Sequence, residues 1–238
     1  AMSEQPNLRP PRRKFLSAAF LAAIQGSLLP RISLGAFEED SSVFKGESLD
    51  GWMTLEGQAV RSGWEAKGGE IFLKRGGLRA GHIITRKEFG DFELIFDWKI
   101  AKGGNSGIKY RVRKYGDRTL GCEYQIYDPN GQKVDSKNKT ASLYDLYEPD
   151  ESIQARRAGE WNSAKISVRE NKIEHWLNGS RVVMATVGDE QWKQRIAQSK
   201  FNDAEKFSEN RCGHIMLTDH GSDVHYRNFQ FTAFEPGC

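Results

Sequence analysis

The sequence predicts an all-β domain, folded as a β-sandwich with one short helix. Short segments of alternating polar and apolar residues recur along the chain, separated by turns rich in glycine and asparagine. The clearest alternation covers residues 89–100, where Phe92, Leu94, Phe96, Trp98 and Ile100 alternate with Glu93, Asp97 and Lys99. A period of two places the two sets on opposite faces of one strand, as expected for a strand that covers a core.

The other elements follow from the same signals. Residues 43–52 form a lead-in, and alternating or strand-like segments lie at 58–66, 70–73, 82–85, 142–147, 165–169, 172–177, 180–185, 213–218 and 224–234. The Asn178-Gly179 pair predicts a tight hairpin between two of them. The one expected helix covers residues 189–199, with Asp189 as its N-terminal cap.

Two strands in the middle of the chain carry the most polar candidate face. Residues 107–113 and 122–128 are expected to pair across a turn region at Gly116-Asp117. Alternation places Ile108, Tyr110 and Val112 toward the core, and Arg111, Glu123 and Gln125 together on the opposite face. Polar groups on a rigid sheet suit a sugar-like ligand, while most polar strand faces are simply solvated.

Two long loops interrupt this pattern. Residues 129–140 are rich in Asn, Lys, Asp and Gly, and residues 148–159 form a second long connection. Long loops in a compact domain are often functional. Tyr144 and Trp161 lie in or beside these loops, where an aromatic ring can stack on a sugar or anchor the loop to the sandwich.

Residues 1–36 are expected to be a leader rather than part of the fold. Arg12-Arg13-Lys14-Phe15-Leu16 is a twin-arginine motif, and an apolar run over residues 15–29 follows it. The run is too short and too polar for a membrane span, which needs roughly 20 apolar residues. We therefore expect a periplasmic or secreted protein whose residues 37–238 form a single domain without a membrane span.

Charge argues against a nucleic-acid partner. Residues 1–36 hold five basic residues and one acidic residue, so the 35 basic and 32 acidic residues of the chain become 30 and 31 in the remainder. The formal net charge thereby changes from +3 to −1, which is not the basic footprint of a nucleic-acid-binding domain.

The three cysteines have no zinc-site spacing. The chain has three cysteines, Cys122, Cys212 and Cys238, and an odd number cannot all pair within one chain. A bridge between Cys122 and Cys212 and two free buried thiols both fit the sequence. We expect no organic cofactor, because the chain has no nucleotide or phosphate motif.

A series of short motifs stands in a fixed order over residues 43–234. They are FKGESLDGW (44–52), FELIFDWKIAKGGNSGIKYRV (92–112), EYQIYD (123–128), LYDLY (143–147), GEWN (159–162), EHWLNG (174–179), SKF (199–201), DHG (219–221) and YRNFQF (226–231). In this order they resemble the 3-keto-disaccharide hydrolase domain family. The resemblance implies a concanavalin-like jelly roll of two antiparallel sheets, one of them concave. It also implies a secreted or periplasmic enzyme that acts on glycosides already oxidised at C3. One departure is Thr218, where the family usually has glutamine before Asp-His-Gly.

The chemistry of a 3-keto sugar fits the candidate residues better than ordinary hydrolysis does. Ordinary glycoside hydrolysis needs two carboxyl groups facing one bond. Glu123 and Asp128 are the nearest pair on one strand, but their odd spacing points them to opposite faces. In a 3-keto sugar the ketone acidifies the C2 proton, and its removal gives an enolate that expels the C1 substituent before water adds. One base and one group that stabilises the oxyanion are sufficient.

These considerations give a candidate site. His220 is the expected base, and Glu123 is a second candidate base or the partner that orients His220. The expected substrate-binding residues are Arg111, Gln125, Asn105, Tyr144 and Trp161. The structural alternatives are a turn histidine at His220, a turn residue at Asn105 and a surface salt bridge between Glu123 and Arg111.

A divalent metal is compatible with Glu123, Asp219 and His220 as its ligands. His175 shares a face with Ile173 and is not placed in the site. Two other functions suit the same fold, namely a non-catalytic carbohydrate-binding or adhesion module and a conventional glycoside hydrolase. The sequence predicts a carbohydrate substrate in each case and no particular oligomeric state.

Overall fold

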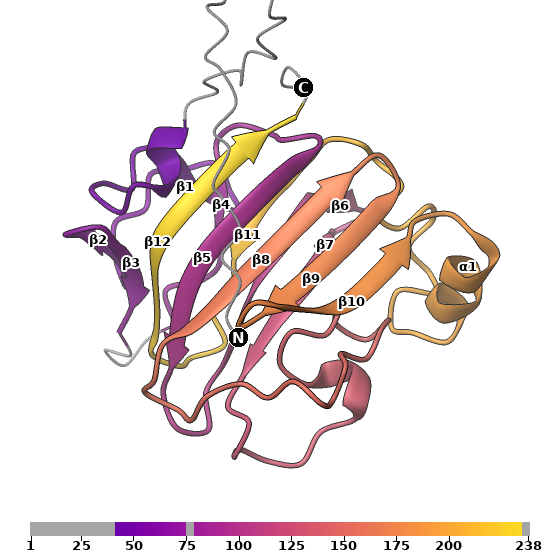
Figure 1. The fold of residues 1–238 in the computed structure, drawn as a ribbon. Helices are drawn as coiled ribbons and strands as arrows, with labels where there is room; N and C mark the ends of the chain where they lie inside the picture. Colours follow the sequence, from indigo (N-terminus) through magenta and orange to yellow (C-terminus); the bar gives the residue numbers. More distant parts are fainter. Residues whose placement is uncertain (1–40, 75–78, 235–238) are drawn as a thin grey trace, which may run out of the picture. The chain divides into compact units, whose positions relative to one another are not determined.

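A computed structural model describes residues 41–74 and 79–234, which form a sandwich of two antiparallel sheets (Figure 1). The first sheet has the order β1 (Trp52–Thr54), β4 (Ile83–Thr85), β11 (His214–Leu217), β6 (Asn105–Tyr115) and β7 (Arg118–Tyr127). The second has the order β10 (Ser180–Thr186), β9 (Lys172–Leu177), β8 (Asn162–Arg169), β5 (Phe92–Ile100), β12 (Val224–Ala233), β3 (Glu70–Leu73) and β2 (Trp64–Lys67). The expected β-sandwich is therefore confirmed. The leader predicted at residues 1–36 lies outside the described ranges.

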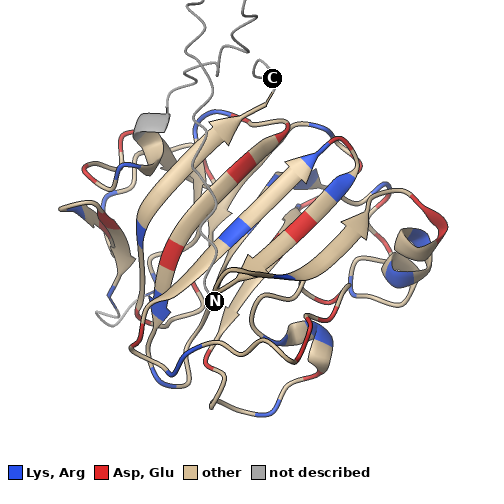
Figure 2. Ribbon diagram, viewed as in Figure 1, with Lys and Arg blue, Asp and Glu red and all other residues tan. Residues whose placement is uncertain are grey.

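The core lies between the sheets and follows the alternation of the strands. In β5, Phe92, Leu94, Phe96, Trp98 and Ile100 are all buried, and the residues between them are partly exposed. The other face of the seven-stranded sheet carries charge, and Figure 2 shows basic and acidic positions alternating across its strands. Ion pairs such as Lys165 with Glu93, at 3.3 Å, link neighbouring strands there. That face is accordingly a solvated outer surface.

Few elements interrupt the sandwich. The helix α1 (Glu190–Ala197) is capped as expected, since Oδ1 of Asp189 accepts the N–H of Trp192 at 2.7 Å. Short 3₁₀ helices form at η1 (Ser41–Phe44) and η2 (Ser136–Asn138). Within the described ranges, no helix has the length and apolar character needed to cross a membrane.

Two segments differ from their predicted form. Residues 142–147 make only isolated bridges, because Leu143 pairs with Tyr124 and with Tyr147 and the chain turns between them. Of the weak segment 58–66, only the end joins a strand.

Cys122 is a free buried thiol, so the possible bridge to Cys212 is absent.

A β-bulge in β6 changes which residues face the core. Across the pair with β7, Tyr110 lies opposite Cys122 and Arg113 lies opposite Leu120, so β6 has one extra residue in this interval. Arg111 takes a positive φ of 52° in the bulge. Val112 consequently packs with Ile84 and Met216 on the outer face of the five-stranded sheet, not with the core as alternation predicted.

Arg111 is a structural residue, and its predicted place beside Glu123 and Gln125 is wrong. The bulge turns its side chain inward, where it is 1% exposed. Nη1 donates to the backbone oxygen of Ser208 at 3.1 Å, and Nη2 donates to the backbone oxygen of Glu170. The guanidinium thus links β6 to the β8–β9 turn and to the loop after α1.

Replacing Arg111 should therefore affect stability first. In Arg111→Met both carbonyls lose a charged donor inside the protein, and we expect the free energy of unfolding to fall by roughly 2–4 kcal/mol. Chemical denaturation measures this change. Arg113→Met is the matched control, because Arg113 is exposed in the same strand, and its effect should stay within about 0.5 kcal/mol. An Arg111 variant of unchanged stability would contradict the structural role.

His175 lies in the core on the same side of β9 as Ile173, and it is fully buried. Nδ1 lies 3.1 Å from the backbone oxygen of Ala141, and Nε2 lies 2.8 Å from the hydroxyl of Tyr110. Since a carbonyl can only accept, Nδ1 carries the proton and Nε2 accepts the Tyr110 O–H. Burial lowers the pKa of His175 to about 4.

This buried imidazole predicts loss of stability in acid. Because its pKa is lower in the folded chain than in the unfolded chain, the unfolded chain binds more protons between pH 6.5 and about 4. Stability should fall as pH decreases through this window, by up to about 3 kcal/mol from this group. The measurement is the free energy of unfolding against pH for wild type and His175→Gln. A variant with an unchanged slope would show that His175 does not contribute.

Candidate functional site

The candidate site lies on the outer face of the five-stranded sheet, where β6 and β7 pair. Three cross-strand pairs define it, namely Asn105 with Tyr127, Gly107 with Gln125, and Lys109 with Glu123. Directly opposed residues share a face, so Lys109 occupies the position beside Glu123 that was expected for Arg111. The rest of this face is apolar, because Ile84, Val112 and Met216 lie there under Met53 and Leu55.

Glu123 is the central carboxylate of this face. It is 4% exposed, its Oε2 lies 3.6 Å from Nζ of Lys109, and its Oε1 has no hydrogen-bond partner among the described residues. Burial raises its pKa, and the nearby ammonium groups of Lys109 and Lys200 and the hydroxyl of Thr218 oppose the shift. An uncommitted buried oxygen of this kind is available to a ligand or a proton.

Gly107 makes room for this carboxylate. A Cβ atom at position 107 would lie 2.5 Å from Oε1 of Glu123, a distance at which one of them has to move. Thr218 lies on the same face, and its backbone N–H donates to the oxygen of Gly107 at 3.0 Å. The threonine that replaces the family's usual glutamine is therefore in reach of Glu123.

Gln125 and Asn105 are brought together with Glu123, as predicted. Nε2 of Gln125 donates to Oδ1 of Asn105 at 3.3 Å, while the buried Oε1 of Gln125 has no partner among the described residues. Asn105 begins β6 and is not a left-handed turn residue. Its backbone N–H donates to Oγ of Ser222 at 3.1 Å, which connects it to the loop that carries His220.

The loop between β11 and β12 presents His220 against a second histidine, His82. Their ring centroids are 5.7 Å apart in an edge-to-face arrangement. Nδ1 of His82 accepts the backbone N–H of Asp219 at 2.9 Å, so a neutral His82 carries its proton on Nε2. Asp219 holds the loop, since Oδ2 accepts the N–H of Gly81 at 2.9 Å and Oδ1 accepts the N–H of Gly221 at 2.7 Å.

Burial and nearby positive charge keep His220 neutral. Burial lowers its pKa to about 4, and the charges of His82, Lys109 and Arg79 act in the same direction. The pKa of His82 is also lowered, mainly by burial and by Lys109. The charge of Lys109 thus acts on Glu123 and on both histidines.

Tyr144 and Lys200 border the site from the loops. The backbone N–H of Tyr144 donates to the backbone oxygen of Glu123 at 3.0 Å. Nζ of Lys200 lies 4.0 Å from the centre of the Tyr144 ring. The backbone N–H of Lys200 donates to Oδ2 of Asp145 at 2.8 Å. Partial burial lowers the pKa of Lys200, although the charge of Glu123 opposes that shift. Tyr144 therefore lies beside Glu123, and its substrate-binding role stays a prediction.

Trp161 lies elsewhere, and its predicted place in the site is wrong. Its ring contacts residues on the outer face of the seven-stranded sheet: Lys99 at 4.5 Å, Arg227 at 3.8 Å and His225 at 6.4 Å between centroids. These cations occupy the ring where a sugar would stack. Trp161 therefore anchors the loop before β8 to the opposite side of the sandwich.

The candidate metal ligands Glu123, Asp219 and His220 do not form a metal site in the described residues. Both carboxylate oxygens of Asp219 already accept backbone N–H groups. No group of three or more His, Cys, Asp or Glu side chains with metal-binding geometry occurs in residues 41–74 and 79–234. The set Glu123, Asp219 and His220 is accordingly not supported as a ligand set.

Three residues of the site were not predicted from the sequence. Lys109 takes the place beside Glu123 that the alternation predicts for Arg111, because the bulge after Tyr110 has no clear sequence signal. Lys200 belongs to the SKF motif (199–201), one of the family motifs in the sequence, but the motif alone does not indicate a role for the lysine. His82 begins the expected segment 82–85, and its proximity to His220 depends on the sheet order β4-β11.

Comparison with known proteins identifies the family of this chain. The family of 3-keto-alpha-glucoside-1,2-lyase-like domains matches residues 39–232. A 3-keto-disaccharide hydrolase of Bacteroides thetaiotaomicron is 32% identical over 228 residues, covering 82% of this chain and 78% of that protein. A crystal structure of a candidate glycosyl hydrolase from Parabacteroides distasonis has a TM-score of 0.73 at 28% identity, covering 81% of this chain and 93% of that one. A second protein from that organism, at 21% identity and a TM-score of 0.62, shares the fold. The chain belongs to the family of 3-keto-alpha-glucoside-1,2-lyase-like domains.

Proposed function

We propose that this protein is an exported carbohydrate-active enzyme that cleaves glycosides oxidised at C3 of the sugar. The Bacteroides relative is named for hydrolysis of 3-keto-disaccharides, and this chain carries the family's domain over residues 39–232. Export is part of the proposal because of the twin-arginine motif Arg12-Arg13.

One observation supports this chemistry above the others. A buried carboxylate, Glu123, has an oxygen without a partner in the part of the chain that the structure describes, and it lies beside the ammonium of Lys109. The neighbouring Gln125 also has an uncommitted oxygen on the same face. Asp128 does not supply the second carboxylate that ordinary hydrolysis needs, because its two oxygens accept the N–H groups of Asn130 and Gly103.

The proposed reaction begins at C2 of the oxidised sugar. A base takes the C2 proton, and the electron pair moves toward the C3 carbonyl to form an enolate. The enolate then re-forms the ketone, a C1=C2 double bond forms, and the C1–O bond breaks to release the leaving alkoxide, which takes a proton. Water adds at C1, and a proton returns to C2, so the net reaction is hydrolysis.

His220 is the base that we favour. It is neutral above about pH 4, and it is only partly buried, so a substrate can reach it. Lys109 lies beside Glu123, its charge also acts on His220, and it supplies positive charge where the enolate oxygen develops. Glu123 holds that ammonium in place, and Gln125 and Asn105 supply amides for sugar hydroxyls.

The proposal predicts release of free sugar from a 3-keto disaccharide by the purified protein. His220→Ala and Glu123→Gln should each lower kcat/KM by roughly 10²–10⁴-fold, because each removes a group that acts in proton transfer or holds the charge that stabilises it. His225→Ala is the matched control, since that histidine lies on the opposite sheet and contacts Glu70.

The assay is made on several linkages, with and without a divalent cation, and on the unoxidised disaccharides. Cleavage that does not depend on the 3-keto group would favour a conventional hydrolase. Sugar binding without turnover in any of these assays, unaffected by His220→Ala, would favour a binding module.

The pH dependence separates the two candidate bases. If neutral His220 takes the proton, kcat/KM should fall as pH decreases through about 4. Since His82 lowers the pKa of His220, His82→Gln should move this acid limb to higher pH. If His82→Gln leaves the pH of the acid limb unchanged, the base is assigned to Glu123 instead. Circular dichroism at each pH ensures that the protein remains folded.

A further inference from the structure

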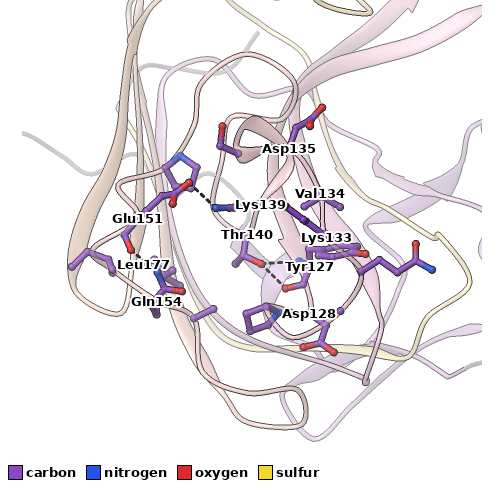
Figure 3. Close-up of a pocket in the computed structure, with 17 residues that line it drawn as sticks. Tyr127, Asp128, Lys133, Val134, Asp135, Lys139, Thr140, Glu151, Gln154 and Leu177 are labelled. Atoms are coloured by element: carbon purple, nitrogen blue, oxygen red, sulfur yellow. Dashed lines mark hydrogen bonds and ion pairs between the residues drawn. The ribbon is translucent and has the colours of Figure 1, made fainter.

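A separate cavity lies between the two long loops, and none of the predicted site residues lines it. Its volume is about 640 Å³, and it is bounded by residues 127–140, residues 149–155 and Leu177 (Figure 3). Leu177 at the end of β9 and Ile153 contribute apolar surface, while Gln132, Gln154 and Ser136 contribute amide and hydroxyl groups. The long loops singled out in the sequence therefore enclose a space.

The walls of this cavity are fixed by hydrogen bonds and one ion pair. Nζ of Lys139 lies 2.6 Å from Oε1 of Glu151 and joins the two loops, as Figure 3 shows. The hydroxyl of Thr140 accepts the backbone N–H of Tyr127 at 3.0 Å. Asp128 closes the turn at Asn130 and binds the N–H of Gly103 at 2.7 Å. The cavity is thus formed without a ligand.

The lining fits an uncharged polyol better than an ion. Its charged side chains have both signs, and Lys139 and Glu151 neutralise each other. Side-chain amides and hydroxyls match the hydroxyl groups of a sugar, and apolar residues match the C–H surface of its ring. A phosphate or a metal ion would need a one-sided charge that this lining lacks.

The cavity is also continuous with the strand that carries the candidate site. Tyr127, which lines it, is in β7 on the same side as Glu123 and Gln125. Four residues separate Tyr127 from Glu123, which corresponds to roughly 14 Å along the strand. A glycan longer than one sugar unit is therefore the ligand that suits both places.

We infer that this cavity binds a neutral sugar unit of the substrate, distant from the oxidised sugar. The inference rests on the proposed function for the substrate class, and it extends that class from disaccharides to longer glycans. The amide of Gln132 and the side-chain oxygen of Gln154 supply the specific contacts, while Nε2 of Gln154 already donates to the backbone oxygen of Glu151.

Calorimetry with unoxidised trisaccharides tests this inference without any reaction. Maltotriose, cellotriose and laminaritriose are titrated into the full chain and into two variants. Gln132→Ala/Gln154→Ala removes both amides, and Val134→Trp fills the space. At least one trisaccharide should bind to the wild type, and both variants should weaken that binding by about tenfold or more. Gln191→Ala is the control, because it removes an exposed amide from α1.

A second measurement compares kcat/KM for a 3-keto trisaccharide and a 3-keto disaccharide. The ratio should fall in both cavity variants and stay unchanged in Gln191→Ala. Absence of trisaccharide binding at millimolar concentration, or equal binding by wild type and both variants, overturns the inference. Binding that the variants weaken supports the cavity even if no 3-keto substrate is cleaved, in which case only the proposed function fails.

Discussion

The β-bulge in β6 decides which side chains reach the candidate site. Up to Tyr110 the strand alternates regularly, so Lys109 points outward beside Glu123. The extra residue then turns Arg111 toward the interior and Val112 toward the outer face. The same local event thus gives the site an ammonium in place of a guanidinium. It also gives the core a buried cation. A lysine is the more adjustable of the two at a reacting centre, because its ammonium is a compact charge whose pKa responds to its surroundings.

Four buried polar residues in and around the candidate site fall into two kinds, according to whether each of their oxygens has a hydrogen-bond partner in the described chain. Asp128 and Asp219 are buried, and each uses both carboxylate oxygens to accept backbone N–H groups at the turns around the site. Glu123 and Gln125 are equally buried, yet each has an oxygen without a partner in the described chain. Because leaving such atoms unsatisfied costs stability, a ligand that completes their hydrogen bonds is a physical reason for their presence. The two aspartates support the loops around the candidate site, while Glu123 and Gln125 keep an oxygen available for a ligand.

Much of the fold could be predicted because its signals are local. The alternation of β5, the Asn178-Gly179 hairpin and the Asp189 cap each depend on residues close in the chain, and the structure has all three. Errors came from features without a local signal. Nothing near Arg111 marks the bulge, and its carbonyl partners, at Glu170 and Ser208, are distant in sequence. Trp161 contacts the outer face of the seven-stranded sheet because it directly precedes β8, and the sheet to which β8 belongs is not given by the local pattern. The pairing of His82 with His220 likewise requires the sheet order, which alternation does not give.

The inward position of Arg111 also has a consequence for how the chain folds. Its two carbonyl acceptors lie 59 and 97 residues further along the chain, so neither exists as a partner until the β8–β9 turn and the loop after α1 have docked. Until then, the guanidinium on the β6–β7 hairpin stays hydrated, and the bulge lacks the hydrogen bonds that hold it against the core. Contacts of such long range form late and slow the folding of β-sandwiches. The strand pair that bears the candidate site would therefore reach its final shape only when most of the sandwich is already assembled.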